Sequence, residues 1–325
     1  MALLEVRDLS VTYRTSSGPV PAVRNVDLEI AAGETLGVAG ESGCGKSTMA
    51  MALLRLLPPE TAVEGSILLD GEEVLQMKPG RLRAVRWATA SVIFQGAQHV
   101  LNPVQRIGHQ IDEAIQVHGM ASANRVDELL TLVGLTPGRA DSYPHELSGG
   151  QKQRVMIAMA LACDPLLLIA DEPTTALDVM VQAQVLRLLA DIKRDRGLSM
   201  LFITHDLSVL ASVADRLAVM YAGRIVEEGP AAEMLRRPGH PYTSALAAAF
   251  PTIGDPSSRR HPEGLPGDPP DPSALPTGCA FHPRCPVALD ECASVEIGLR
   301  PVVAGWRAAC VRVAPELAAE RGAPG

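Results

Sequence analysis

The stretch GESGCGKST, Gly40–Thr48, separates two apolar segments, Leu36–Ala39 and Met49–Leu57. The short first segment is typical of a buried strand, and the longer second segment is expected to form a helix. Between them stands the spacing G-x-x-x-x-G-K-[S/T], in which backbone N–H groups converge on phosphate oxygens at the start of a helix. The sequence therefore predicts a strand, a phosphate-binding loop and a helix in succession.

The residue types inside this loop have separate chemical tasks. Glycine allows the tight turn, because it adopts backbone conformations that other residues avoid. The Lys46 ammonium group can reach the β- and γ-phosphates of a nucleotide, and the Ser47 hydroxyl can ligate Mg²⁺. We expect the phosphates to contact the whole loop, which consists of Gly40, Glu41, Ser42, Gly43, Cys44, Gly45, Lys46, Ser47 and Thr48.

The composition is that of a globular chain with no electrostatic reason to bind nucleic acid. The chain has 325 residues, 47% of them hydrophobic, and a net charge of −8 from 29 basic and 37 acidic residues. One domain of roughly 250 residues with an appendage is expected at this length. The basic residues are not clustered, so nucleic acid is not expected as the main partner.

Neither a membrane span nor a signal peptide is expected. Apolar runs such as Leu166–Ala170 are far shorter than the roughly 18 to 20 residues that a membrane-spanning helix needs. The N-terminal sequence MALLEVRDLSV carries acidic residues early and alternates like a strand, unlike a signal peptide. These features predict a cytoplasmic location.

Hydrophobic periodicity divides the chain into regions of different character. Two alternating segments, Leu3–Tyr13 and Ala22–Ile30, predict an antiparallel sheet at the edge of the fold. Residues 87–162 are mainly helical in period and are predicted to form an inserted helical subdomain. The α/β pattern then returns, with predicted elements at Leu166–Ala170, Val179–Arg196, Ser199–Thr204, Val209–Ala214 and Arg216–Tyr221.

These regions suggest a division into three parts. Residues 1–238 are predicted to form a nucleotide-binding domain, 239–278 a proline-rich extension or linker, and 279–325 a cysteine-rich segment. The prolines of the middle part are incompatible with a regular core, so an extended path over the surface is expected there.

A second motif supplies carboxylates. The apolar segment LLLIADE ends in Asp171 and Glu172. Asp171 is expected to hold Mg²⁺, directly or through water, and Glu172 to orient and deprotonate an attacking water molecule. A strand that merely ends in solvated acids is the alternative, and the phosphate-binding loop upstream argues against it.

The segment ELSGGQKQR, Glu146–Arg154, discriminates most strongly between nucleotide-binding proteins. A serine and two glycines at a helix start present a hydroxyl and free N–H groups, which suit a γ-phosphate. The loop at Gly40–Thr48 already provides one complete set of phosphate ligands. A second set is therefore expected to serve a nucleotide bound by another chain, through Ser148, Gly149, Gly150 and Gln151.

Taken together, LSGGQ, GESGCGKST and ADEPTTALD resemble the motifs of ATP-binding cassette (ABC) proteins, over the range Leu3 to about Gly229. The resemblance implies ATP and Mg²⁺ as cofactors and an ATPase activity. It also implies an α/β fold of the P-loop NTPase type, with a RecA-like core, an antiparallel β edge sheet and an inserted helical subdomain. The cysteine-bearing segment would be a C-terminal extension of that fold.

The resemblance assigns further residues one by one. Tyr13 resembles the aromatic residue that stacks on adenine, and Gln95 resembles the glutamine that senses Mg²⁺ and water and links the site to a membrane partner. Asp178 resembles the acid that communicates across the dimer. His205 resembles the histidine that bridges the γ-phosphate and Glu172.

A finer resemblance is to the oligopeptide/dipeptide and nickel importer branch, in its D-type ATPase. It rests on LNPV at 101–104, EPTTALDVMVQAQVL at 172–186, GHPYTSAL at 239–246 and the tail TGCAFHPRCPVALDEC. This implies peptide uptake, with nickel uptake or a soluble ATPase acting on nucleic acid or ribosomes as alternatives. The sequence GAQH at 96–99 departs from the family pattern, which leaves the contact with the permease in question.

The same resemblance implies a set of partners. They are an F-type ATPase as the second subunit of a heterodimer, two transmembrane permease subunits and an extracytoplasmic solute-binding protein. The chain would then be peripheral on the cytoplasmic face of the cell membrane.

Four of the six cysteines crowd into the last fifth of the chain: Cys279, Cys285, Cys292 and Cys310. In a reducing compartment such clustering points to metal before disulfides, although the spacing is too loose for paired C-x-x-C zinc sites. A [4Fe–4S] cluster, Zn²⁺ and free or buried thiols all remain open, and the family tail favours the cluster. Cys44, before a helix start, is expected to be thiolate-prone and protected by MgATP from alkylation.

Overall fold

The computed structural model describes residues 2–96, 100–120, 124–175, 177–249, 265 and 267–313. The chain divides into two compact units that interleave along the sequence. The first consists of Met1–Leu4, Ile30–Glu34 and Leu68–Ile203, and the second consists of Glu5–Glu29, Thr35–Ile67 and Thr204–Gly325. The proline-rich residues 250–264 and the departure at 97–99 lie outside the described residues.

The first unit contains a parallel sheet in the order β6-β7-β8. Its strands are β6 (Ala90–Ile93), β7 (Leu167–Asp171) and β8 (Ser199–Thr204), and every residue of β7 and β8 is buried. Continuous apolar runs of this kind are typical of strands covered on both faces. Because the strands are parallel, the residues that follow them leave the sheet at one edge.

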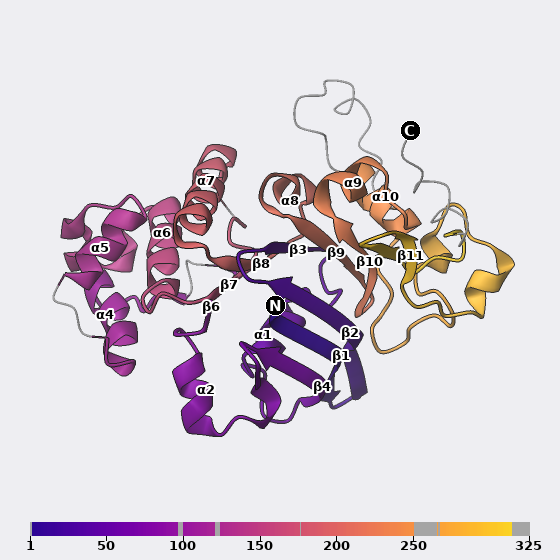
Figure 1. Cartoon of the computed structure of the whole chain (residues 1–325), viewed down its shortest axis with the longest axis horizontal. Coiled ribbons are helices and arrows are strands. Elements are labelled where there is room, and N and C mark those ends of the chain that lie inside the picture. Colours follow the sequence, from indigo (N-terminus) through magenta and orange to yellow (C-terminus); the bar gives the residue numbers. More distant parts are fainter. Residues whose placement is uncertain are drawn as a thin grey trace. The chain divides into compact units, whose positions relative to one another are not determined.

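Four helices of the first unit contact one another beside this sheet: α4 (Ile107–Val117), α5 (Arg125–Leu132), α6 (Gly149–Ala160) and α7 (Val179–Arg196) (Figure 1). In α4, Ile107, Ile111 and Ile115 recur every four residues and are fully buried, which places them on one helix face. The predicted region 87–162 is mainly helical, although β6 lies within it. The other helical elements of the first unit are η1 (Val74–Gln76), α2 (Pro79–Val85), η2 (Pro137–Asp141) and η3 (Pro144–Glu146).

The two long N-terminal strands belong mostly to the second unit. They are β1 (Ala2–Thr15) and β2 (Gly18–Ala31), and the strand order is β2-β1-β4, with β4 at Ala62–Leu69. In β2, Val26 and Leu28 are buried between exposed neighbours, so one face of this sheet carries the apolar side chains. The short strand β5 (Glu72–Glu73) pairs antiparallel with β4.

A second group of paired strands in this unit begins with β3 (Thr35–Ala39), which pairs parallel with β9 (Arg216–Tyr221). Strand β10 (Arg224–Pro230) returns antiparallel to β9, as the predicted turn at Ala222-Gly223 requires. Helices of this unit are α1 (Lys46–Leu53), α8 (Leu207–Val213), α9 (Ala231–Arg236) and α10 (Pro241–Ala248).

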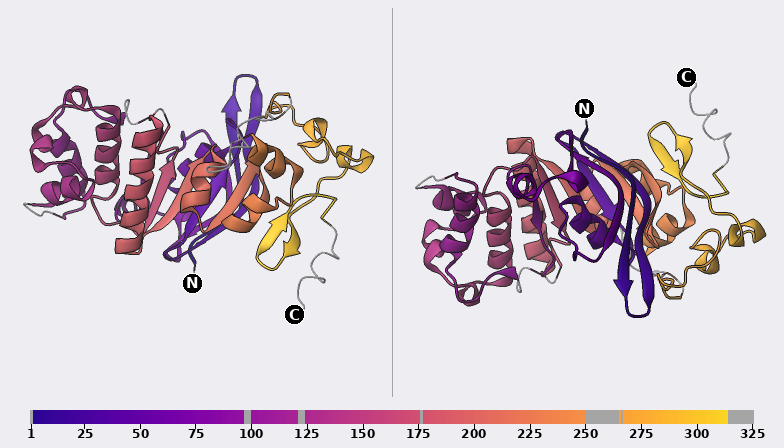
Figure 2. Two further views of the ribbon diagram at one scale, coloured as in Figure 1. Left: turned by 90° about the horizontal axis from the view of Figure 1, so that it is seen from above. Right: turned by 90° about the horizontal axis from the view of Figure 1, so that it is seen from below.

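The cysteine-bearing segment extends this sheet. Strand β12 (Trp306–Ala308) pairs antiparallel with β10, and β11 (Arg300–Val303) pairs antiparallel with β12. The buried Trp306 donates its indole N–H to Glu227 Oε1 at 2.8 Å. Both views of Figure 2 show this segment, in yellow, beside the orange elements of the unit. Two short 3₁₀ helices, η4 (His282–Arg284) and η5 (Asp290–Ala293), complete it.

Most strand and helix predictions are confirmed within a few residues, and α7, β8 and β9 match their predicted bounds. One helix boundary was wrong, because α1 begins at Lys46 inside the loop and ends at Leu53, not at Leu57. None of the helices in the described ranges combines the length and the apolar character that a bilayer crossing requires.

Candidate functional site

The loop Gly40–Thr48 lies between β3 and α1 in the second unit. Gly40 and Gly45 have φ values of 155° and 108°, in a region that side-chain-bearing residues rarely adopt. A Cβ atom at Gly40 would overlap the carbonyl oxygen of Met220, and one at Gly45 would overlap that of Ala22. Glycine is therefore required at both turns of the loop for steric reasons.

Lys46 is enclosed by its own loop. The residue is 5% exposed, and Nζ donates to the carbonyl oxygens of Gly40 at 2.7 Å and Glu41 at 2.8 Å. Ser47 and Thr48 follow in the first turn of α1, whereas Ser42 and Gly43 are exposed. The loop thus holds an ammonium group beside the N-terminus of an eight-residue helix, which is a suitable setting for phosphate.

Tyr13 lies next to the same loop. Its hydroxyl is 3.2 Å from Thr48 Oγ1, which connects the end of β1 to the first turn of α1. The half-buried ring is thereby placed beside a phosphate-binding motif. Stacking on adenine stays a prediction.

The expectation of a thiolate-prone Cys44 was wrong. The side chain is only 7% exposed, and burial raises the pKa of its thiol, although the neighbouring Lys46 opposes that rise. Desolvation therefore outweighs the helix N-terminus and the ammonium group. Cys44 is a poor target for alkylation in this conformation.

The carboxylates of the first unit are placed at the end of β7. Asp171 is its last residue and is 3% exposed, and Glu172 follows with a φ of 46°, which is uncommon for a residue with a side chain. Glu172 Oε2 accepts hydrogen bonds from Gln95 Nε2 at 2.9 Å and from Thr175 Oγ1 at 2.8 Å. A strained backbone and two donors to one oxygen fix the direction of this carboxylate.

Gln95 and Glu172 were both predicted site residues, and they meet here, but the contact from Thr175 was not predicted. Thr175 stands three residues after Glu172 in the segment EPTTALD, which entered the sequence interpretation only as a family pattern. The feature of the sequence that could have predicted this contact is a threonine in the turn directly after a carboxylate, because its short hydroxyl side chain can donate to a nearby acceptor.

Ser148 is the N-cap of the twelve-residue helix α6. Its Oγ accepts from the Gln151 backbone N–H at 3.3 Å, and Gln151 Oε1 accepts from the Ser148 N–H at 3.0 Å. This reciprocal pair is a capping box, and it leads directly into Gly149 and Gly150. The Ser148 side chain is exposed, so the helix start faces outward.

Asp178 and His205 occupy the ends of other elements. Asp178 caps α7, because its Oδ1 accepts from the Val181 N–H at 3.0 Å. His205 follows β8 and is exposed. The structure thus collects Gln95, Asp171, Glu172, Asp178 and the Ser148 helix start in the first unit. Tyr13, the phosphate-binding loop and His205 belong to the second.

The four C-terminal cysteines line one small cavity of about 20 Å³ in the second unit: Cys279, Cys285, Cys292 and Cys310. Burial raises the pKa of the Cys279 and Cys310 thiols. Among the described residues, no three His, Cys, Asp or Glu side chains are arranged to hold a metal ion. The predicted four-cysteine ligand set is therefore gathered in one place, but not in a coordinating arrangement.

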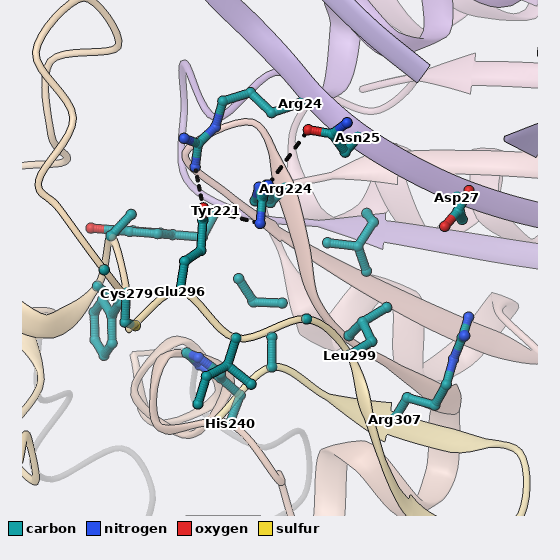
Figure 3. A pocket seen from close by; sticks show the side chains of 18 residues that line it. Arg24, Asn25, Asp27, Tyr221, Arg224, His240, Cys279, Glu296, Leu299 and Arg307 are labelled. Carbon is teal, nitrogen blue, oxygen red and sulfur yellow. Dashed lines mark hydrogen bonds and ion pairs between the residues drawn. The ribbon is translucent and has the colours of Figure 1, made fainter. Parts of the chain in front are cut away.

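A larger cavity of about 310 Å³ lies between β2, the β9–β10 hairpin and the C-terminal segment (Figure 3). Arg24 and Arg224 both point toward Glu296, at 3.6 Å and 3.0 Å. Burial and the charge of Arg224 lower the pKa of Arg24. Arg307 pairs with Glu228. Arg24 and Arg224 thus share the single carboxylate of Glu296, and the ion pairs attach the C-terminal segment to β2 and β10.

Comparison with known proteins gives two matches in succession along the chain. A model of the family described as ABC transporter matches residues 23–175. A model described as Oligopeptide/dipeptide transporter, C-terminal region, matches residues 226–292. The second range includes α10 and three of the four C-terminal cysteines.

Similar proteins cover nearly the whole chain. A probable peptide ABC transporter ATP-binding protein of Sinorhizobium fredii is 45% identical over 318 residues, which are 95% of each chain. The oligopeptide transport ATP-binding protein OppD of Salmonella typhimurium is 45% identical over 296 residues, 89% of this chain and 88% of OppD. A solved dimeric ATP-binding cassette with bound ADP and phosphate has a TM-score of 0.63 and 29% identity. The matched region covers 70% of this chain and 98% of the solved chain.

Proposed function

The chain belongs to the ABC transporter family, and we propose that it is the ATP-hydrolysing subunit of an importer of oligopeptides or dipeptides. The observation that carries this proposal is the succession of a cassette and the oligopeptide/dipeptide C-terminal region in one chain. Relatives at 45% identity that match both parts carry peptide-transport names. Nickel uptake has no comparable support.

In this proposal, different predicted site residues have different roles in ATP hydrolysis. Bound MgATP supplies the γ-phosphate that water attacks. Lys46 and the N–H groups of its loop hold the phosphates, and Ser47 and Asp171 are suited to ligate Mg²⁺. The Glu172 carboxylate, directed by Gln95 and Thr175, accepts the proton of the attacking water. His205 is assigned to the γ-phosphate.

Ser148 and the glycines after it are assigned to the nucleotide of a second ATPase subunit. The capping box supports this, because it fixes an exposed helix start whose hydroxyl and N–H groups suit a phosphate. The similar solved cassette is itself a dimer, which agrees with this assignment. The partner is proposed to be a different, F-type subunit. Asp178 is assigned to communication across that dimer.

Replacing Ser148 by Asp provides a selective test of this dimer. Asp is as good an N-cap as Ser, so the stability of α6 should be retained. Its carboxylate would repel the γ-phosphate of the partner's nucleotide. Steady-state ATPase activity of the assembled pair should fall at least about tenfold, while ATP binding to the isolated chain stays unchanged. Equal ATPase activity of Ser148→Asp and the wild type would contradict the assignment.

The remaining partners are proposed to be two transmembrane permease subunits and an extracytoplasmic solute-binding protein. The chain itself would be held at the cytoplasmic membrane face by the permeases, with Gln95 next to the point of contact. The experiment is affinity purification of the chain from detergent-solubilised membranes, followed by identification of co-purified proteins. Permease chains, and ATP-dependent uptake of a labelled dipeptide by the reconstituted complex, are expected. Ribosomes or nucleic acid, or uptake of nickel alone, would contradict the proposal.

For the C-terminal cysteines we propose a metal centre, a [4Fe–4S] cluster or alternatively Zn²⁺. The sharing of one cavity by four thiols supports it, since soft thiolates are the preferred ligands of both. Binding would require the four cysteine side chains to rearrange, because they are not in a coordinating arrangement here.

Metal analysis after anaerobic and aerobic purification tests this proposal. Visible absorbance with equal amounts of iron and sulfide is expected, or one equivalent of zinc. Cys292→Ser should abolish the metal content, because it removes one of the four ligands, and Cys44→Ser should leave it unchanged. A chain that carries neither iron nor zinc under anaerobic conditions would exclude both metals.

A further inference from the structure

Arg284 of η4 reaches the phosphate-binding loop. Its Nη1 and Nη2 donate to Glu41 Oε2 at 2.7 Å and to Glu41 Oε1 at 2.9 Å. This is a bidentate ion pair in which the Arg284 side chain is 7% exposed and the Glu41 side chain 20%. Paired guanidinium and carboxylate groups of this geometry are among the strongest and most directional contacts in proteins.

A second contact from outside the loop acts on the same residue. The backbone N–H of Glu41 donates to the Tyr242 hydroxyl at 2.8 Å, and Tyr242 is fully buried at the start of α10. Glu41 is thus held by its side chain and by its backbone from two separate elements of the C-terminal region. Lys46 Nζ in turn donates to the carbonyl oxygen of Glu41, which ties this residue to the phosphate-binding ammonium group.

An aromatic cluster makes these contacts rigid. The rings of Tyr221, Tyr242 and Phe281 have centroids 4.5 to 5.3 Å apart. The Arg284 guanidinium lies 6.0 Å from the Tyr221 ring centroid and donates to the Tyr221 hydroxyl at 3.3 Å. Aromatic pairs at such distances restrict one another's rotation and add stability beyond their buried area. Because Phe281 directly precedes η4, movement of η4 is expected to disturb Tyr242 through these ring contacts.

The cysteine cavity is contiguous with this cluster. Phe281 lines it together with Cys279 and Cys285, and Cys285 is the residue directly after Arg284. In addition, Pro269, Pro270 and Pro272 line a small cavity with Glu41 and Cys44 of the loop. Arg284 of the cysteine-bearing segment and the prolines before that segment are therefore both in contact with the phosphate-binding loop, although they are far from it in sequence.

We infer that Arg284 and Tyr242 are positioning residues of the phosphate-binding loop, so that ATP binding and the conformation of the cysteine-bearing segment are energetically coupled. The inference rests on the proposed role of this loop in ATP binding. By thermodynamic linkage the coupling is reciprocal: ATP stabilises the segment as much as the segment favours ATP. The chemical state of the cysteines is thus sensed at the ATP site.

Replacing Arg284 by Gln tests the coupling at the ATP site. The dissociation constant for MgATP should rise about tenfold, because the Glu41 carboxylate loses a charged, bidentate partner. The effect should appear in KM, whereas kcat at saturating MgATP stays within about twofold of the wild type. Arg284→Lys should recover part of the affinity. Arg300→Gln is the matched control, since it removes the same charge from an exposed position in the same segment.

Accessibility of the cysteines gives a readout that a purely structural role would not move. In the metal-free protein, where no metal protects the thiols, Cys285 alkylation is followed by mass spectrometry. It should be several-fold slower with MgATP in the wild type and in Arg300→Gln. In Arg284→Gln this protection should be lost. Tyr242→Phe removes a single hydroxyl and serves as a second variant, with a smaller loss of affinity and of protection.

The outcomes separate this inference from the proposed function. A wild-type chain that fails to bind MgATP would overturn the role of the loop itself. If the variants Arg284→Gln and Tyr242→Phe fold and bind MgATP with the same affinity as the wild type, only the coupling is overturned. MgATP that leaves Cys285 alkylation unchanged in the metal-free wild type would overturn it as well.

Discussion

Replacing Glu172 by Gln is expected to lower steady-state ATP hydrolysis at least about 100-fold, since a positioned general base contributes 10²–10⁴ in rate. The amide keeps the shape of the side chain and an oxygen that accepts from Gln95 and Thr175, but it cannot take a proton from water. ATP binding should therefore persist, and the ATP-bound dimer should accumulate. Phosphate release at saturating MgATP, together with a nucleotide-binding titration, measures both effects.

Two further variants make this result specific. Thr175→Val removes one of the two donors to the Glu172 carboxylate and should reduce kcat by a smaller factor, with little change in KM. Glu60→Gln, at an exposed position in the second unit, is the control for loss of one negative charge and should leave the rate unchanged. Normal turnover by Glu172→Gln would rule out Glu172 as the base.

Replacing Lys46 by Ala is expected to weaken MgATP binding about 100-fold, or about 2.7 kcal/mol. The ammonium group makes charge-assisted bonds to phosphates, each of which contributes about 1.5–3 kcal/mol. Its loss would also leave the carbonyl oxygens of Gly40 and Glu41 without this donor inside the loop. A titration with MgATP gives the affinity, and peptide uptake by the reconstituted importer should stop.

Lys78→Ala is the control for Lys46→Ala. Lys78 is exposed and precedes α2, so its removal changes the net charge without touching the loop. Binding of MgATP by Lys46→Ala within about threefold of that by Lys78→Ala would contradict the assignment of Lys46 to the phosphates.

Predictions from sequence succeeded where one local property decides the structure. Strands β3 and β8 are short apolar runs, and α7 is a long periodic segment bounded by Asp178 and Gly197. The phosphate-binding loop follows from its spacing, because only glycine tolerates the contacts at Gly40 and Gly45. In each case the deciding residues lie within one turn or one element.

Predictions failed where burial decides. Cys44 was expected to be thiolate-prone from its place before a helix, yet its surroundings raise its pKa. The strands β11 and β12 were not predicted, since Arg300–Val303 and Trp306–Ala308 are short and gain their order by pairing with β10. Exposure and pairing partners are properties of the folded chain, and local sequence carries little information on them.

The sequence by itself determined the family of this protein and hence its use of ATP, and motif spacing predicts which side chains face a phosphate. In the sequence, the cysteine-bearing segment is far from the phosphate-binding loop, so no contact between them was predicted. Only the tertiary structure shows that the two are in contact: Glu41 and Arg284 are 243 residues apart in sequence and form a bidentate ion pair. Such a contact depends on how β9, β10 and α10 carry the chain back to the loop, and that path is set by packing of the whole unit.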